Sequence, residues 1–333
     1  MKTAFLRVLV PLEGLFDRLL NRTGKDRIVE AYAGYATDDQ MIVRGRVLTA
    51  LRRNEPLPQQ GVWTNVRQML SLFLTDEVAE VTVRAGRSRA RTDEEGYFQI
   101  VLPRPEARGW IEVPVTIDGR QGSTPCPVLV PRADAEFMVI SDIDDTMMET
   151  GAYSLARNLW TSFTGNALTR RVFPDAVALI RDLSANGRNP VYYVSSSPWN
   201  LYSFLTAIFE RAGLVPGPMF LRDLGLSETK LITDGHGSHK GGSIDLLLAG
   251  SAPLQAILIG DTGQKDARIY REAFERHPGR IRGIVLRVPG PGLDAADRQD
   301  LAALERAGIE LFHGSDFTGM AHRIRRAAPS SVG

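Results

Sequence analysis

The sequence predicts an α/β fold class, with a doubly wound parallel sheet preceded by a small β-sandwich domain, on three observations. The chain has 333 residues, which at about 150 residues per domain suggests two domains. Up to Pro131, short runs of alternating apolar residues lie between turn residues, as in half-buried strands. Beyond it, continuous apolar runs alternate with segments of helical periodicity, as in a parallel sheet. We expect an amphipathic helical segment over residues 1–30, a β-sandwich-like domain over 31–134 and the parallel-sheet domain over 135–333.

The expected N-terminal helix carries large apolar residues at helical spacing, with basic residues beside them. Such a helix either lies on a membrane surface or packs against the protein, and the sequence leaves both alternatives open. Charged residues interrupt its apolar runs, so we expect no signal peptide. The apolar positions are Leu9, Leu12, Leu15, Phe16, Leu19 and Leu20, and the basic ones are Lys2, Arg7, Arg18 and Arg22.

The β-sandwich-like domain is expected to contain five strands and one helix. Gly, Pro and charged turns separate the strands, and one such turn precedes the aromatic pair Tyr97 and Phe98. Apolar residues at helical spacing after the first strand predict a helix that interrupts or covers the sheet. The expected strands are residues 40–48, 80–84, 97–102, 110–117 and 125–130, and the helix is 61–73.

The parallel-sheet domain is expected to alternate strands with helices that begin and end at preferred residues. Pro174 lies near the first turn of one helix and Gly187 just past its end, and a second apolar stripe runs from Leu201 to Gly213. The expected strands are residues 137–141, 191–194, 219–221, 256–259 and 283–286, with a last strand near 309–312 and a basic helix at 322–326.

Composition narrows the class of protein and of partner. Hydrophobic residues make up 43% and charged residues 24%, as in a folded soluble protein. The 40 Lys and Arg residues balance 39 Asp and Glu residues, so no global field would hold nucleic acid, and we expect no such partner. No apolar run approaches the roughly 18 residues that span a bilayer. Cys126 is the single cysteine, which favours a reducing compartment and predicts a cytoplasmic protein, with peripheral membrane contact and the oligomeric state left open.

Acidic clusters follow two of the expected buried strands. Asp142, Asp144 and Asp145 follow the first, and Asp261 and Asp266 follow a later one. Carboxylates this close raise one another's pKa unless a cation or hydrogen-bond donors compensate. Because two buried strands both end in this way, we interpret the clusters as parts of one divalent-metal site rather than as solvated turns.

Four motifs follow one another in this domain: Asp142-Ile143-Asp144-Asp145-Thr146, Tyr193-Val194-Ser195-Ser196-Ser197-Pro198-Trp199, His239-Lys240 and Gly260-Asp261-Thr262-Gly263-Gln264-Lys265-Asp266. Together they resemble the haloacid dehalogenase superfamily and, more narrowly, its App-type (actin patch protein) phosphatidate phosphatase catalytic domains, over residues 137–286. The resemblance implies a Rossmann-like, haloacid dehalogenase-like sheet of order 5-4-1-2-3 with a minimal cap. Asp142 and Asp261 would then meet where the strand order reverses.

The resemblance assigns a role to each acidic residue. Asp142 is expected to attack phosphorus and form an aspartyl-phosphate, and Asp144 to act as the general acid and base. Oxygen ligands suit Mg²⁺, so we expect Mg²⁺ as the cofactor. Its ligands would be Asp142, Asp144 through its backbone carbonyl, and Asp261, with Asp266 either a ligand or one contact further away.

The phosphate group of the substrate is expected to contact hydroxyl and ammonium groups. Ser195 and Lys240 would take part in catalysis and, with Ser196, bind the phosphate oxygens. Two aromatic residues, Trp199 and Trp160, either line the substrate entrance or belong to the core, and the sequence leaves both interpretations open.

Other reactive residues fit weaker sites. His236 and His239, with Asp234 nearby, make a poor zinc set because no cysteine accompanies them. No Gly-x-Ser-x-Gly elbow surrounds Ser195, which disfavours a serine hydrolase. No histidine is near Cys126 in the sequence, so we interpret it as a packed residue.

The insert after the first motif, residues 147–171, is too short for a cap domain, and an open site suits a bulky substrate. By the resemblance, a phosphate ester and in particular the lipid phosphatidate is the expected substrate, with diacylglycerol and phosphate as products. Two alternatives stay open: a phosphatase for phosphoproteins or soluble phosphoesters, and a phosphatidate-binding module with little turnover.

Overall fold

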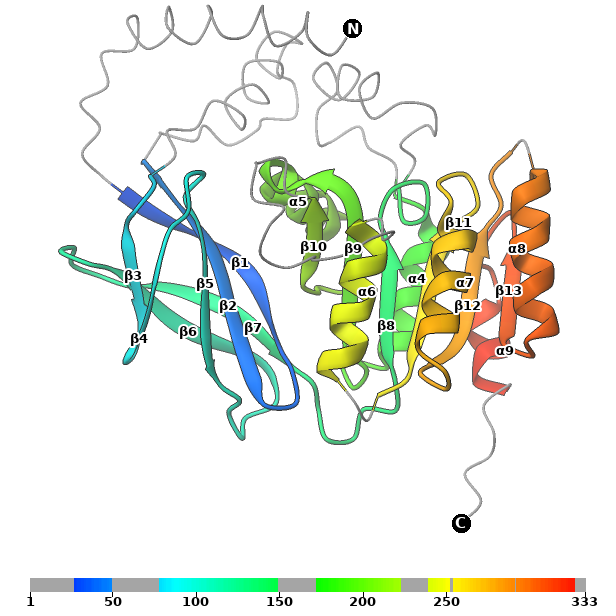
Figure 1. Cartoon of the computed structure of the whole chain (residues 1–333), viewed down its shortest axis with the longest axis horizontal. Helices are drawn as coiled ribbons and strands as arrows, with labels where there is room; N and C mark the ends of the chain where they lie inside the picture. Colours follow the sequence, from blue (N-terminus) through cyan, green and yellow to red (C-terminus); the bar gives the residue numbers. More distant parts are fainter. Residues whose placement is uncertain are drawn as a thin grey trace, which may run out of the picture.

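The computed structural model describes residues 27–49, 78–148, 172–222, 239–251, 254–290 and 292–326. It contains a curved sheet on the N-terminal side and a three-layer α/β unit on the C-terminal side (Figure 1). The expected helix over 61–73, the N-terminal segment up to residue 26 and most of the insert over 147–171 lie outside the described residues. No helix in the described part of the chain is long and apolar enough to cross a membrane.

The N-terminal sheet has the strand order β4-β3-β6-β7-β1-β2-β5. All its pairs are antiparallel except β1 with β7. The edge strands β4 and β5 contact each other, and alternate side chains enclose a core rich in valine. The strands are β1 (Arg27–Ala36), β2 (Gln40–Thr49), β3 (Thr82–Ala85), β4 (Ser88–Arg91), β5 (Tyr97–Pro103), β6 (Gly109–Ile117) and β7 (Thr124–Val130).

Two strands of this sheet depart from the sequence prediction. β1 begins at Arg27, inside the segment expected to be helical. Its Ala and Gly residues are poor strand formers, and pairing with β2 and β7 on its two sides stabilises it instead. A Cβ atom at Gly34 would lie 2.2 Å from the carbonyl oxygen of Ile42, so glycine is required for this close approach. β4 is a polar edge strand without apolar alternation, which hid it from the pattern.

The C-terminal sheet is parallel throughout, with the order β10-β9-β8-β11-β12-β13. This is the order 5-4-1-2-3 implied by the resemblance, extended by a sixth strand at the edge beside β12. β8 is the first strand in the chain and lies where the order reverses. The strands are β8 (Met138–Asp142), β9 (Val191–Pro198), β10 (Met219–Arg222), β11 (Ala256–Asp261), β12 (Ile281–Arg287) and β13 (Glu310–Gly314).

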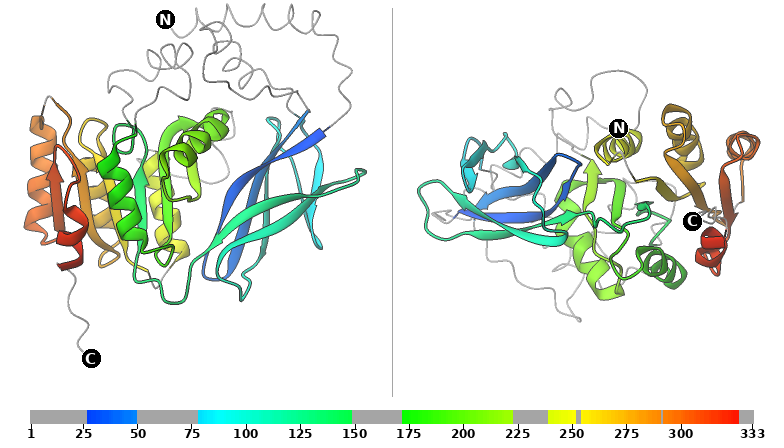
Figure 2. Two further views of the ribbon diagram at one scale, coloured as in Figure 1. Left: turned by 180° about the vertical axis from the view of Figure 1, so that it is seen from behind. Right: turned by 90° about the horizontal axis from the view of Figure 1, so that it is seen from below.

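Helices cover both faces of this sheet (Figure 2). Alternate strand side chains point to opposite faces, so each strand contributes to two separate cores. One core takes its helical residues from α4 (Pro174–Ser184), α5 (Tyr202–Ala212) and α9 (Met320–Arg326), and the other from α6 (His239–Gly250), α7 (Asp266–Arg276) and α8 (Ala295–Arg306). The doubly wound parallel sheet predicted from the sequence is therefore confirmed.

The expected helix ends need one adjustment. α5 ends where predicted, at Gly213, which adopts a φ of 66° and donates its N–H to the last turn. α4 ends earlier than Gly187, because Ala185 already takes the left-handed conformation with a φ of 46°. Because all six strands are parallel, their carboxyl ends lie at one edge of the sheet.

Candidate active site

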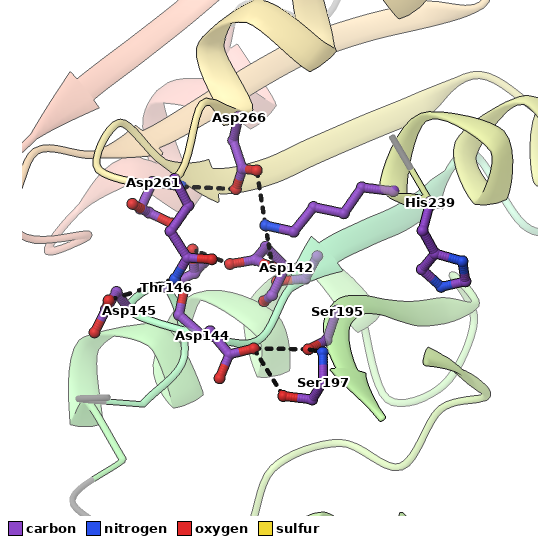
Figure 3. A network of polar contacts seen from close by, with 12 residues as sticks. Asp142, Asp144, Asp145, Thr146, Ser195, Ser197, His239, Asp261 and Asp266 are labelled. Atoms are coloured by element: carbon purple, nitrogen blue, oxygen red, sulfur yellow. Dashed lines mark hydrogen bonds and ion pairs between the residues drawn. The ribbon is translucent and has the colours of Figure 1, made fainter. Parts of the chain in front are cut away.

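The candidate site lies at the carboxyl ends of β8, β9 and β11 (Figure 3). β8 ends at Asp142 and the adjacent β11 ends at Asp261, with Ile259 opposite Ser141 in the ladder. Carboxylate oxygens of Asp142, Asp261 and Asp266 all lie within 4.8 Å of one another. The parallel register therefore joins the two acidic motifs into a single cluster.

Asp142 lies at the centre of this cluster and is fully buried. Its Oδ1 lies 2.6 Å from the Lys240 ammonium, and its Oδ2 accepts a hydrogen bond of 3.0 Å from the Thr146 hydroxyl. Burial raises the pKa of Asp142 well above its ordinary value, while the Lys240 charge acts in the opposite direction. A carboxylate keeps unused lone pairs beside two such donors, so Asp142 has an oxygen for a cation or for phosphorus.

Lys240 projects from the first turn of α6 and connects two of the carboxylates. Its ammonium lies 2.6 Å from Asp142 and 2.8 Å from Asp266, and its side chain is only 3% exposed. Burial alone lowers the pKa of Lys240, but the two carboxylates outweigh it and the net shift is upward. Lys240 is therefore a fixed positive charge that offsets part of the acidic cluster.

Asp261 supplies the clearest evidence for a cation. Its side chain is buried, and neither carboxylate oxygen has a hydrogen-bond partner among the described residues. Burial, followed by the nearby charge of Asp266, raises the pKa of Asp261 to about 8. A buried carboxylate without partners is costly, and a divalent cation would compensate it. An all-oxygen donor set of this kind fits Mg²⁺.

Asp266 contacts both Asp261 and Lys240. Its Oδ2 accepts a hydrogen bond from the backbone N–H of Asp261 at 3.2 Å, and its Oδ1 pairs with Lys240. A Cβ atom at Gly260 would lie 2.5 Å from Asp266 Oδ2 and 2.7 Å from the Tyr270 hydroxyl. Glycine before Asp261 thus allows the Asp266 carboxylate to reach the back of β11.

Asp144 is half-buried and lies on the other side of the cluster. Its Oδ2 accepts hydrogen bonds from Ser195 at 2.7 Å and from Ser197 at 3.1 Å, and Gln264 donates to its backbone oxygen at 3.2 Å. The sequence predicts that Ser195 binds phosphate, but in the structure its hydroxyl donates a hydrogen bond to Asp144. Successive strand residues point to opposite faces, so Ser197 shares the face of Ser195 whereas Ser196 does not.

Three supporting residues of this site were not predicted from the sequence. Ser197 and Gln264 both contact Asp144, and the third is Arg287 at the end of β12. The period-two pattern of β9 could have revealed Ser197, because it places every second residue on one face. Gln264 and Arg287 carry no such local signal, since the residues that they contact lie far away in the sequence.

Arg287 holds the loop that contains the nucleophile candidate. Its Nε donates to the backbone oxygen of Thr146 at 3.3 Å, and its Nη2 donates to Asp175 at 2.8 Å. The guanidinium carbon lies 4.2 Å from the ring centres of both Phe173 and Phe317. Because Thr146 in turn bonds the carboxylate at the end of β8, this arginine restrains that carboxylate through one intermediate residue.

The remaining candidates fall in different places. Trp199 stacks on Tyr32 of β1, so it lies at the contact between the N-terminal sheet and the α/β unit. Trp160 lies outside the described residues. Cys126 is packed in the core of the N-terminal sheet, where burial raises the pKa of the thiol to about 12, in agreement with a packed role.

A parallel sheet whose first strand ends in Asp-x-Asp-x-Thr, with a lysine and a later aspartate pair beside it, is the arrangement that the resemblance to haloacid dehalogenase-like proteins implies. Residues 137–288 match the family model described as "Phosphatidate phosphatase APP1, catalytic domain". This match confirms the resemblance that the four motifs carry, and it covers all of them.

Curated relatives match over the same part of the chain. An uncharacterized protein of Schizosaccharomyces pombe, C29B5.04c, is 29% identical over 153 residues, which are 45% of this chain and 24% of that protein. Phosphatidate phosphatase APP1 of Saccharomyces cerevisiae is 26% identical over 149 residues, 45% of this chain and 25% of the yeast protein. The alignments thus span about a quarter of each relative.

Among solved structures, the class C acid phosphatase from Bacillus anthracis with tungstate bound is similar at 14% identity and a TM-score of 0.31. The similarity covers 60% of this chain and 82% of that structure. A TM-score this low supports no conclusion about function.

Proposed function

We propose that this protein is a Mg²⁺-dependent phosphomonoester hydrolase that acts on phosphatidate or a related lipid phosphate through an aspartyl-phosphate. The observation that carries the proposal is the buried Asp142 carboxylate, paired with Lys240 and adjacent to the Asp261 carboxylate, which has no hydrogen-bond partner in the described part of the chain. The match to a phosphatidate phosphatase catalytic domain supports the choice of a lipid phosphate.

Charge balance supports a single divalent ion. Asp142, Asp261 and Asp266 contribute three negative charges, which Lys240 and one divalent cation together offset. When bound by these carboxylates, Mg²⁺ would neutralise charge on the phosphate and favour its approach to a carboxylate. The buried ammonium of Lys240 would bind the transferring group on the opposite side.

The chemical steps follow from the two aspartates of the first motif. An oxygen of Asp142 attacks phosphorus, the bond from phosphorus to the leaving oxygen breaks, and Asp144 transfers a proton to that oxygen. Asp144 then accepts a proton from water as the water oxygen attacks phosphorus, which releases phosphate and restores Asp142. The serine hydroxyls on Asp144 hold its carboxylate in one orientation for both proton transfers.

A small cap fits the geometry at the ends of the insert. Met148 and Val172 form an antiparallel bridge, and the N–H of Phe173 donates to the carbonyl of Met147 at 2.9 Å. The chain therefore leaves and returns at neighbouring points next to the first motif. The 23 residues between these points are too few for a cap domain, which favours an open site and a large substrate.

Phosphate release from three substrates tests the proposal. Phosphatidate in detergent micelles, p-nitrophenyl phosphate and a phosphoserine peptide would each be assayed with Mg²⁺ and with EDTA. We expect Mg²⁺-dependent release that is fastest from phosphatidate. Fastest release from the peptide would favour a phosphoprotein phosphatase, whereas binding of phosphatidate vesicles without release from any substrate would indicate a binding module.

A further inference from the structure

The N-terminal sheet contacts the segment that joins the end of β9 to the start of α5, residues 198–203, which is called a turn below. Trp199 stacks on Tyr32, with ring centres 5.1 Å apart and planes 13° apart. The hydroxyl of Tyr202 accepts a hydrogen bond of 2.7 Å from the backbone N–H of Ala33. Two more hydrogen bonds join the domains at this turn: Tyr97 to Asn200 at 3.0 Å, and Ser203 to Glu30 at 2.6 Å.

Arg44 of β2 lies at the centre of this contact. Its guanidinium lies over three aromatic rings, one from its own domain and two from the other, at 5.1 Å from Tyr35, 5.2 Å from Trp199 and 4.8 Å from Phe220. Cations over aromatic faces are attracted to them, and more strongly where water is excluded. The arginine thus links β2 to both the turn after β9 and the strand β10.

The polar contacts of Arg44 also cross the domain boundary. Its Nη2 donates to the carbonyls of Ala33 at 2.5 Å and Met219 at 3.1 Å, and the residue is 5% exposed. Among the described residues, no carboxylate forms an ion pair with it. The two carbonyls and the three rings offset the cost of burying this charge. The buried cation therefore links the N-terminal sheet to the end of β9 and to β10.

A short series of contacts leads from Arg44 to the acid of the site. Trp199 follows Ser197 by two residues, and Ser197 and Ser195 both donate to Asp144. The N–H of Ser197 also donates to the Ser195 hydroxyl at 2.9 Å, which makes this end of β9 a single rigid unit. We propose that Arg44 is a positioning residue: by fixing Trp199 it fixes the end of β9 and the two hydroxyls that orient Asp144.

This inference rests on the proposed phosphatase function and gives the N-terminal domain a role in it. An acid that is slightly misplaced transfers its proton poorly, and this matters most when the leaving group is a strong base. The alcohol released from phosphatidate needs that proton, whereas p-nitrophenolate leaves without it. A defect in positioning should therefore depend on the leaving group, while partial unfolding should lower both activities equally.

The experiment compares full-length variants on phosphatidate micelles and on p-nitrophenyl phosphate. Arg44→Met keeps the bulk of the side chain and removes its charge, and Tyr202→Phe removes one interdomain hydrogen bond without opening a cavity. Arg104→Met is the control, because Arg104 also bonds backbone carbonyls, but those of Thr37 and Pro131 in the N-terminal sheet, where it also pairs with Asp38. Thermal unfolding and kcat and KM would be measured for each variant.

We expect Arg44→Met to lower kcat on phosphatidate about 10-fold, a part of the roughly 10²- to 10⁴-fold contribution of a general acid, with KM unchanged and p-nitrophenyl phosphate affected less than about 2-fold. Tyr202→Phe should shift the ratio of the two activities in the same direction, which decides the matter if Arg44→Met does not fold. Arg44→Lys should recover part of the loss, and Arg104→Met should leave the ratio unchanged. Equal losses on both substrates, or none, would overturn the inference, whereas an inactive wild type would overturn the proposed function itself.

Discussion

The two halves of the candidate site are built in different ways. The half around Asp142 and Lys240 is fully buried, and its residues come from the parallel sheet and its helices alone. The half around Asp144 is partly exposed. The serines that bond Asp144 belong to β9, and the segment after β9 contacts the N-terminal sheet. Opposite charges hold the first half together, whereas hydrogen bonds orient the Asp144 carboxylate in the second. Substitutions in the two halves should therefore have different effects on activity.

The largest expected effect is the loss of the nucleophile. Asp142→Asn keeps the shape of the side chain and its contact with Thr146, but removes the oxygen nucleophile and the charge paired with Lys240. We expect kcat to fall by about 10⁴-fold or more on every substrate, with a cooperative thermal transition retained. A well-folded variant that keeps more than about one hundredth of the activity would exclude an aspartyl-phosphate intermediate. It would also exclude the division of the site into a charged half and an oriented half.

Removal of the acid should give a smaller and more selective loss. Asp144→Asn keeps both serine partners but cannot donate the proton, so kcat on phosphatidate should fall about 10²- to 10³-fold and that on p-nitrophenyl phosphate much less. Asp134→Asn is the control, since Asp134 is an exposed aspartate that pairs with Arg132 before the amino end of β8. If both substrates lose activity equally, Asp144 belongs functionally to the charged half.

The charged half should also respond to metal without any substrate. Above its pKa of about 8, Asp261 is a buried charge that has no hydrogen-bond partner in the described chain, so without Mg²⁺ at pH 9 Asp261→Asn should unfold about 2 to 5 °C above the wild type. Added Mg²⁺ should stabilise the wild type, by about 2.7 kcal/mol at 100 times its Kd, and the variant hardly at all. Thermal unfolding with a Mg²⁺ titration measures both effects. Equal Mg²⁺ stabilisation of the two proteins would place the ion elsewhere.

The sequence predicted the charged half well and the oriented half only in part. Asp142 and Asp261 each follow an apolar strand, and parallel topology brings such strand ends together whatever lies between them. Ser197, by contrast, gains its role from the face of β9 that it occupies. Arg44 contacts the segment after β9 from the N-terminal sheet, and its partners Trp199 and Met219 are distant in the sequence. Contacts that depend on how two domains pack leave no periodic signal in one chain.

Strand β1 illustrates the same limit within the fold. Its Ala and Gly residues are poor strand formers, and the expected helical segment extends to residue 30, yet the backbone from Arg27 pairs with the adjacent strand β2, and Gly34 and Tyr35 also pair with the distant strand β7. Pairing with other strands overrides local propensity here. The elements that follow their own sequence signal are those whose burial is complete within one domain, as in β8 and β11.

The smallest expected effect concerns Arg287, which supports the charged half from outside the acidic cluster. Arg287→Met keeps an apolar stem between Phe173 and Phe317 but loses the hydrogen bonds to Thr146 and Asp175. The loop that bonds Asp142 through Thr146 should then be less well fixed, which lowers kcat about 5- to 10-fold on both substrates alike. Arg287→Lys should not restore activity fully, since a lysine lacks the planar fork that reaches Thr146, Asp175 and Ser315 at once. If the loss appears on phosphatidate alone, the loop of the first motif orients the acid as well as the nucleophile, and the two halves are not independent.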